Sequence, residues 1–148
     1  MKTLTTILFL SLLSSPCWSE TITDVVKRDG IYYKKYSDVP FSGKITGSFK
    51  GLIKNGMREG AWFRYYSNGQ LDFKGNYKNG KEEGAWVLYW KNGQLSSKGN
   101  YKNGKKDGLY IFYSKDGSLV KKRSGIFIDG KKMRDLNTFS KGTIRTRI

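Results

Sequence analysis

Acidic residues are the first place to look for catalytic chemistry, because this chain has no histidine and one cysteine, Cys17. Histidine- and cysteine-based triads and Cys/His zinc sites therefore cannot be assembled. Six carboxylates fall at predicted turns: Glu59, Glu82, Glu83, Asp107, Asp116 and Asp129. Glycoside hydrolysis needs two carboxyl groups facing each other across a cleft, and these positions imply no such pair. The sequence predicts that the protein is not an enzyme and uses no metal or cofactor.

Aromatic side chains point instead toward binding. One set keeps its apolar or aromatic character in every copy of a repeat and is predicted to be core: Phe63, Tyr65, Val87, Tyr89, Ile111 and Tyr113. A second set includes the alternate positions, varies in size and polarity, and is the candidate binding groove: Trp62, Arg64, Tyr66, Trp86, Leu88, Trp90, Tyr110 and Phe112. Cross-strand aromatic pairs also stabilise sheets by roughly 0.2–1 kcal/mol each, so a structural role for the second set stays open.

Basic residues outnumber acidic ones by 28 to 12, and many lie toward the C-terminal end. The candidate anion-binding residues are Lys102, Lys105, Lys106, Lys121, Lys122, Arg123, Lys131, Lys132 and Arg134. Such a charge excess draws a protein toward anionic surfaces. Phosphate-bearing lipid, lipopolysaccharide or an acidic partner would suit these side chains, and a solvated basic tail is the structural alternative.

A period of 24 residues positions all these side chains. Gly60-Ala61-Trp62, Gly84-Ala85-Trp86 and Gly108-Leu109-Tyr110 recur at this spacing, and so do Asn68-Gly69, Asn92-Gly93 and Asp116-Gly117. Asn-Gly and Asp-Gly between short periodic runs predict β-hairpins with type I′ turns. From residue 71, Leu71, Phe73, Gly75 and Tyr77 alternate with polar residues, which indicates one packed and one solvated face. The expected fold is all-β: an elongated antiparallel β-meander of tandem hairpins.

The repeat resembles the MORN family. Phe73-x-Gly75-x-Tyr77-x-x-Gly80-Lys81-x-x-Gly84 is similar to its aromatic-x-Gly-x-aromatic-x-x-Gly-Lys-x-x-Gly pattern, and residues 97–108 repeat it with Ser97 in place of the first aromatic. Gly-x-Trp followed by Tyr-x-x-Asn-Gly-Gln-Leu is similar to a bacterial, antitoxin-like variant. The resemblance covers about residues 41 to 130 and implies a MORN-type repeat sheet. Trp86 replaces a second glycine of the usual unit, which weakens the transfer of lipid-head-group binding.

The two ends differ from the array. Residues 1–19 have the layout of a secretory signal, with Lys2, a short apolar run and small residues before a cleavage site after Ser19. A membrane anchor or lipidation at Cys17 are the alternatives. Residues 20–52 are predicted to be capping strands and a degenerate repeat, residues 53–130 the repeats, and residues 131–148 a basic tail.

The expected function follows from these elements. We expect an exported, non-catalytic scaffold, periplasmic or secreted, that binds a protein or an anionic envelope component. Binding of anionic lipid or lipopolysaccharide head groups and an antitoxin-like role beside a toxin protein are the alternatives. Export disfavours nucleic acid as a partner, and no membrane-spanning segment is expected after cleavage. The oligomeric state and the identity of the ligand are left open.

Overall fold

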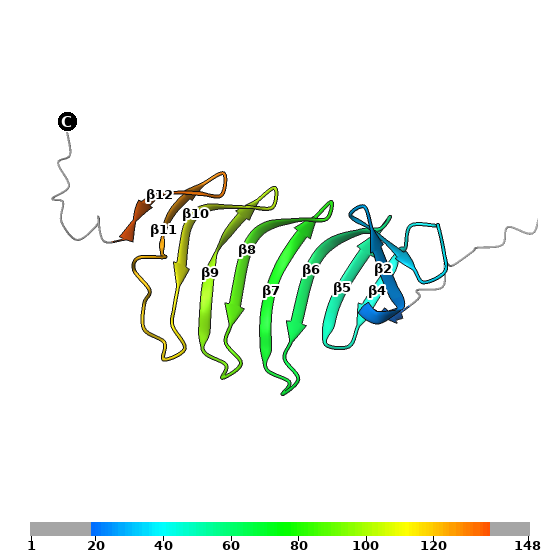
Figure 1. Ribbon diagram of the computed structural model, residues 1–148, viewed down its shortest axis with the longest axis horizontal. Helices are drawn as coiled ribbons and strands as arrows, with labels where there is room; N and C mark the ends of the chain where they lie inside the picture. The colour runs from blue at the N-terminus through cyan, green and yellow to red at the C-terminus, as the bar shows by residue number, and fades with distance from the viewer. Residues whose placement is uncertain (1–18, 137–148) are drawn as a thin grey trace, which may run out of the picture.

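Residues 19–136 of the computed structural model form an elongated array of consecutive strands (Figure 1). The N-terminal elements are β1 (Ser19–Thr21), the 3-10 helix η1 (Ile22–Asp24), β2 (Val25–Arg28) and β3 (Ile31–Lys34). The array continues with β4 (Gly43–Thr46), β5 (Phe49–Lys54), β6 (Met57–Tyr65), β7 (Leu71–Lys78), β8 (Lys81–Tyr89), β9 (Leu95–Lys102), β10 (Lys105–Phe112), β11 (Gly125–Ile128) and β12 (Lys131–Asp135). In this part of the chain no helix is long and apolar enough to span a membrane.

The main sheet has ten strands in the order β1-β4-β5-β6-β7-β8-β9-β10-β11-β12. Every neighbour from β4 onward is antiparallel and consecutive in the chain, so the predicted all-β meander of tandem hairpins is confirmed. The predicted signal segment, residues 1–18 with Cys17, lies outside the described residues. Its cleavage and lipidation therefore stay predictions.

The two kinds of turn differ in geometry. Asn79 and Gly80 both have positive φ, as a type I′ turn requires, and Asn103-Gly104 repeats this. At Asn68-Gly69 only the glycine has positive φ, and the Tyr66 N–H donates to the Gln70 carbonyl across a longer loop. The type I′ prediction is therefore wrong for this turn and for its copies at Asn92-Gly93 and Asp116-Gly117.

Each long hairpin bends at a glycine that lies four residues after the glycine of its Asn-Gly turn. Gly60, Gly84 and Gly108 have φ of +67°, +70° and +77°, and the strand pairing shifts register beside them. A glycine with positive φ is what a β-bulge of this kind uses to bend and twist a strand. In Figure 1 the strands accordingly curve over at their upper ends.

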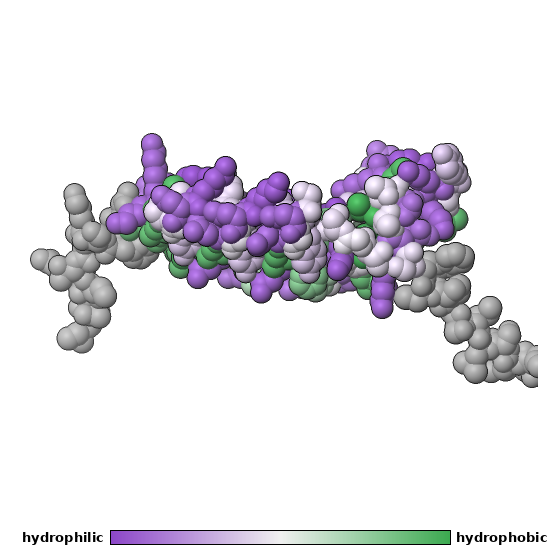
Figure 2. All heavy atoms as spheres, turned by 90° about the horizontal axis from the view of Figure 1, so that it is seen from below, coloured by the Kyte–Doolittle hydropathy of each residue, from purple (hydrophilic) through white to green (hydrophobic). Residues whose placement is uncertain are grey.

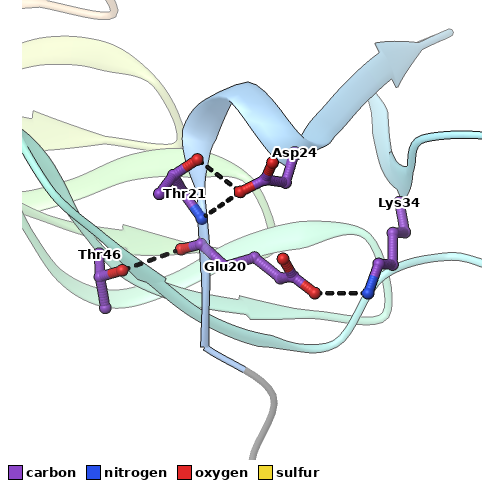
Figure 3. Close-up of polar contacts among 5 residues, drawn as sticks. All are labelled: Glu20, Thr21, Asp24, Lys34 and Thr46. Atoms are coloured by element: carbon purple, nitrogen blue, oxygen red, sulfur yellow. Dashed lines mark hydrogen bonds and ion pairs between the residues drawn. The ribbon is translucent and has the colours of Figure 1, made fainter.

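The N-terminal edge is closed by β1, which runs parallel to β4. Figure 3 shows the polar contacts that hold it: Lys34 Nζ donates to Glu20 Oε1 at 2.5 Å, and Thr46 Oγ1 donates to the Glu20 carbonyl at 3.2 Å. Thr21 donates its N–H to Asp24 Oδ2 at 2.9 Å. Hydrogen bonds from Thr21 lower the pKa of the Asp24 carboxyl. These contacts hold β1 at the edge of the sheet, and the capping role of residues 20–52 stays a prediction.

The C-terminal edge differs from the predicted boundary. Residues 131–135, expected to begin the basic tail, form β12 and pair with β11. The 24-residue period places a glycine at residue 123, but the glycine stands at Gly125. This two-residue shift falls in the segment before β11, where buried Ser124 accepts from the Phe112 N–H at 2.8 Å and donates to the Val120 carbonyl at 2.9 Å. Residues 137–148 lie outside the described part, so a basic tail there stays a prediction.

Candidate functional site

One face of the sheet, here called the aromatic face, is the core. Trp62, Trp86 and Tyr110 are 0%, 6% and 1% exposed. Tyr77 lies edge-on between Trp62 and Trp86, with ring centroids 6.0 and 5.2 Å away, and Tyr101 lies between Trp86 and Tyr110. Burial raises the pKa of the Tyr77 and Tyr101 hydroxyls. The rings thus form one continuous row along the array.

Glycines make this packing possible. A Cβ added to Gly75 would lie 2.2 Å from the Trp86 ring, and a Cβ added to Gly51 or Gly99 would lie equally close to the ring of Trp62 or Tyr110. The indole Nε1 of Trp86 donates to the Asn76 carbonyl at 3.1 Å, which fixes the ring over the neighbouring strand. The glycine of the aromatic-x-Gly motif is therefore the position against which the aromatic side chain of the next strand packs. We call this position a glycine seat.

This arrangement reverses part of the sequence interpretation. Trp62, Trp86 and Tyr110 were predicted to line an exposed groove, and that prediction is wrong because they are buried. The set predicted to be core is only partly buried: Phe63, Tyr65, Val87, Tyr89, Ile111 and Tyr113. Both faces of these strands are apolar. The packed face is the one on which the glycines leave room for the aromatic rings of the neighbouring strands.

The other groove candidates are partly exposed or make structural contacts. The Tyr66 hydroxyl donates to the Tyr89 carbonyl at 2.9 Å, and Trp90 Nε1 donates to the Tyr113 carbonyl at 3.2 Å, so each ties one repeat to the next. Arg64 pairs with Asp72. Leu88 and Phe112 are partly buried beside the aromatic row.

The opposite face carries a different pattern, and we call it the ladder face. Its first row runs through directly paired residues on successive strands: Lys50, Phe63, Lys74, Val87, Lys98 and Ile111. Its second row contains Leu52, Ala61, Asn76, Ala85, Asn100 and Leu109. Directly paired side chains share a face, so lysine and apolar side chains alternate along the first row. The first row contains no carboxylate, whereas Glu59, Glu83 and Asp107 pair directly with Leu52, Asn76 and Asn100 of the second row.

Three hollows repeat along the ladder face, one over β5, one over β7 and one over β9. Their volumes are about 500, 280 and 320 Å³, and each is lined by one of the three glycines. Ala61 and Phe63 form one apolar ridge beside them, and Ala85 and Val87 form the next. Lys74 and Asn76 flank Gly75, and Lys98 and Asn100 flank Gly99. Within the described residues these four side chains have no hydrogen-bond or ion-pair partner.

The basic residues predicted to bind anions do not form one cluster. Lys102 and Lys105 line a separate hollow of about 650 Å³ with Asp107 and Asp129, and Lys105 Nζ lies 2.7 Å from Asp129 Oδ1. Lys131, Lys132 and Arg134 lie on β12, where Lys132 pairs with Asp135. Lys121 and Lys122 are exposed before β11.

Lys106 and Arg123 lie on the aromatic face. The ammonium of Lys106 is 4.6 Å from the Tyr110 ring centroid, and both cations lie over Phe112. Burial, with a smaller contribution from Arg123, lowers the pKa of Lys106. At the other end of the row Arg58 packs over Trp62 in the same way and donates to the Tyr77 hydroxyl. These cations cover the ends of the aromatic row.

The turn carboxylates have structural roles. Glu59 Oε2 accepts from the Asn79 N–H and Glu83 Oε2 from the Asn103 N–H, each at 2.9 Å, so each holds the next turn in place. Within residues 19–136 no group of three or more potential metal ligands lies together. Glu59 and Glu83 thus act on the turns, and the absence of catalytic activity stays a prediction.

The geometry defines a class of protein: a repeat protein whose hairpins stack into one sheet. Residues 58–79 and 82–103 each match the family model of the MORN repeat variant. These two segments are therefore similar to MORN repeats. No curated protein matches the chain. The matched segments span β6 to β9, where the glycine seats and the ladder face are most regular.

Proposed function

We propose that this protein is an exported, non-catalytic scaffold that binds an elongated protein or envelope component through the ladder face. The observation that carries the proposal is the row of Lys50, Phe63, Lys74, Val87, Lys98 and Ile111, which repeats apolar and cationic groups without a carboxylate. Contiguous exposed apolar surface rimmed by polar groups commonly marks an interaction site. The apolar run near Lys2 and the predicted cleavage site after Ser19 support the proposal of a periplasmic or secreted location.

The test is capture of envelope proteins by the full chain and by a ladder variant. Val87→Asp with Ile111→Asp puts two negative charges among the lysines and leaves the aromatic row untouched. A partner retained in moderate salt by the native chain and lost by this variant supports the proposal. Leu119→Asp, which changes a side chain 41% exposed elsewhere, is the matched control. Equal capture by all three chains would contradict it.

A lipid or lipopolysaccharide surface is the second candidate, favoured by the lysines of the same face. Anionic vesicles that bind the native chain, and release it when Lys50, Lys74 and Lys98 are replaced, would favour this candidate over a protein partner. An antitoxin-like role rests on resemblance alone. It requires a toxin protein that the chain binds and neutralises, and export would have to be reconciled with it.

A further inference from the structure

The ladder face has a repeat distance that selects the shape of its partner. Lys50, Lys74 and Lys98 lie on β5, β7 and β9, two strands apart. Adjacent strands are about 4.8 Å apart, so the lysines recur at roughly 9.6 Å along the array. The strands from β5 to β9 stand side by side in Figure 1, so this row crosses them rather than following one strand.

Apolar ridges and hollows also alternate across the strands of the ladder face. Ala61 and Phe63 on β6, and Ala85 and Val87 on β8, form ridges, and the hollows lie over the strands between them. Each hollow over β7 and β9 has a lysine and an asparagine beside its glycine. An ammonium and an amide N–H are donors, so each of these hollows suits a carboxylate.

Polypeptide geometry narrows the choice of partner. A polyproline II segment has three residues per turn and a rise of 3.1 Å, so every third residue points the same way at intervals of about 9.3 Å. The mismatch with the lysine row is about 0.3 Å per interval. In a β-strand, residues three apart point to opposite faces. An α-helix repeats its face about every seven residues, or about 10.5 Å, and loses register faster.

We propose, as a deepening of the proposed function, that the ladder face binds an acidic polypeptide segment in the polyproline II conformation. The segment crosses β5 to β9 with an acidic residue at every third position. Its carboxylates meet Lys50, Lys74 and Lys98, and its intervening residues lie on the ridges formed by Phe63 and Val87. The first row supplies the charge complementarity, because it carries three lysines and no carboxylate, and the carboxylates of this face pair with the second row.

Synthetic peptides test the periodicity directly. The probe is a fluorescein-labelled peptide of four Glu-Pro-Pro units, and its control has the same composition with all four glutamates contiguous. Fluorescence anisotropy with the full chain is expected to show at least tenfold tighter binding of the periodic peptide. Affinity should fall as salt rises, because surface charge pairs are screened. Equal affinity for the two peptides would overturn the proposal.

The chain supplies a matched set of lysine variants. Replacing Lys50, Lys74 and Lys98 by Gln should weaken binding of the periodic peptide at least tenfold. Replacing Lys54, Lys78 and Lys102, which have the same 24-residue spacing and equal charge but lie at the strand ends, should change it less than threefold. Equal losses in the two triple variants would mean non-specific attraction and would overturn the proposal.

The outcomes also separate this inference from the proposed function. If binding of an envelope partner depends on the ladder face but the periodic peptide binds no more tightly than its control, the scaffold function stands and the polyproline II proposal is overturned. If vesicles of phosphatidylglycerol bind through the three lysines and the peptide does not, the face contacts lipid and the inference is likewise overturned. If the ladder variants affect no ligand, both proposals fail.

Discussion

The indole ring of Trp86 lies against the backbone of Gly75 so closely that a Cβ on that glycine would be 2.2 Å from the ring. The contact joins β8 to β7, and equivalent contacts recur one repeat earlier and one repeat later. The stacking of consecutive hairpins therefore requires that these positions carry no side chain.

Gly75→Ala should destabilise the protein by about 1–3 kcal/mol, the usual effect of forcing an extra methyl group into a packed core. Urea denaturation followed by far-ultraviolet circular dichroism measures the difference. Lys74→Ala, on the exposed side of the same strand, should stay within about 0.5 kcal/mol of the native chain. An alanine at residue 75 with native stability would mean that the indole does not occupy this seat.

Trp86→Ala should cost about 3–5 kcal/mol, because it removes a buried indole from the aromatic face. Val87→Ala, the next residue but on the ladder face, should cost about 1 kcal/mol or less, because its side chain is only partly buried. Thermal unfolding of the two variants compares the faces directly. A larger loss from Val87 than from Trp86 would restore the assignment of faces made from the sequence.

The sequence contained the signal that assigns the faces, although alternation alone does not reveal it. Trp62, Trp86 and Tyr110 alternate with Phe63, Val87 and Ile111, and both sets are apolar, so a period of two residues separates the sets without choosing the inner one. The hairpin register pairs Trp62 directly with Gly75, which places the indole on the face of Phe73 and Tyr77. Direct pairing with the Phe73, Gly75 and Tyr77 face would have identified the packed side.

Other features were predictable for simple reasons, and some were not. Hairpins follow from the 24-residue spacing and the Asn-Gly pairs, because glycine and asparagine tolerate positive φ. β12 was missed because the loop between β10 and β11 shifts the pattern by two residues and the basic run 131–134 is typical of a solvated tail. The hollows of the ladder face depend on strand bending and side-chain packing, which periodicity does not specify.

Gly84→Val tests the bend of the hairpin. Gly84 has φ of +70°, and nothing lies within 4 Å of a Cβ built there, so only backbone strain should act. A β-branched residue in this conformation should cost about 1–3 kcal/mol. Gly84→Asn should cost much less, because asparagine adopts positive φ more readily. Thermal melts of both variants give the comparison, and equal losses would indicate a steric cause instead.

Asn92→Asp tests the link between loops of neighbouring repeats. Asn92 Nδ2 donates to the Lys115 carbonyl at 2.9 Å, while its Oδ1 accepts from the Gln94 N–H at 3.1 Å. Aspartate keeps the acceptor and removes the donor, so only the contact between repeats is lost. The expected cost is about 0.5–1.5 kcal/mol by urea denaturation. No change would mean that this contact adds nothing to repeat stacking.

Asp116 should make a pH-dependent contribution to stability. Hydrogen bonds from the Ser114 hydroxyl and from Ser118 lower the pKa of its carboxyl to about 2. Because the folded-state pKa lies below the unfolded value of about 3.9, the contribution is fully present above that value and is lost as the pH falls through about 2. Asp116→Ala should therefore melt at a lower temperature than the native chain at pH 6, with the difference shrinking toward pH 2.

Ser114→Ala isolates the cause of that shift. The Ser114 hydroxyl donates to Asp116 Oδ1 at 2.5 Å, and its removal leaves the donors of Ser118 in place. The Asp116 pKa, followed by carbon-detected NMR, should rise in this variant and remain below the ordinary value, because two of the three donors persist. A carboxyl that titrates near pH 4 in the native chain would show that the loop after β10 does not hold this hydrogen-bond network in solution.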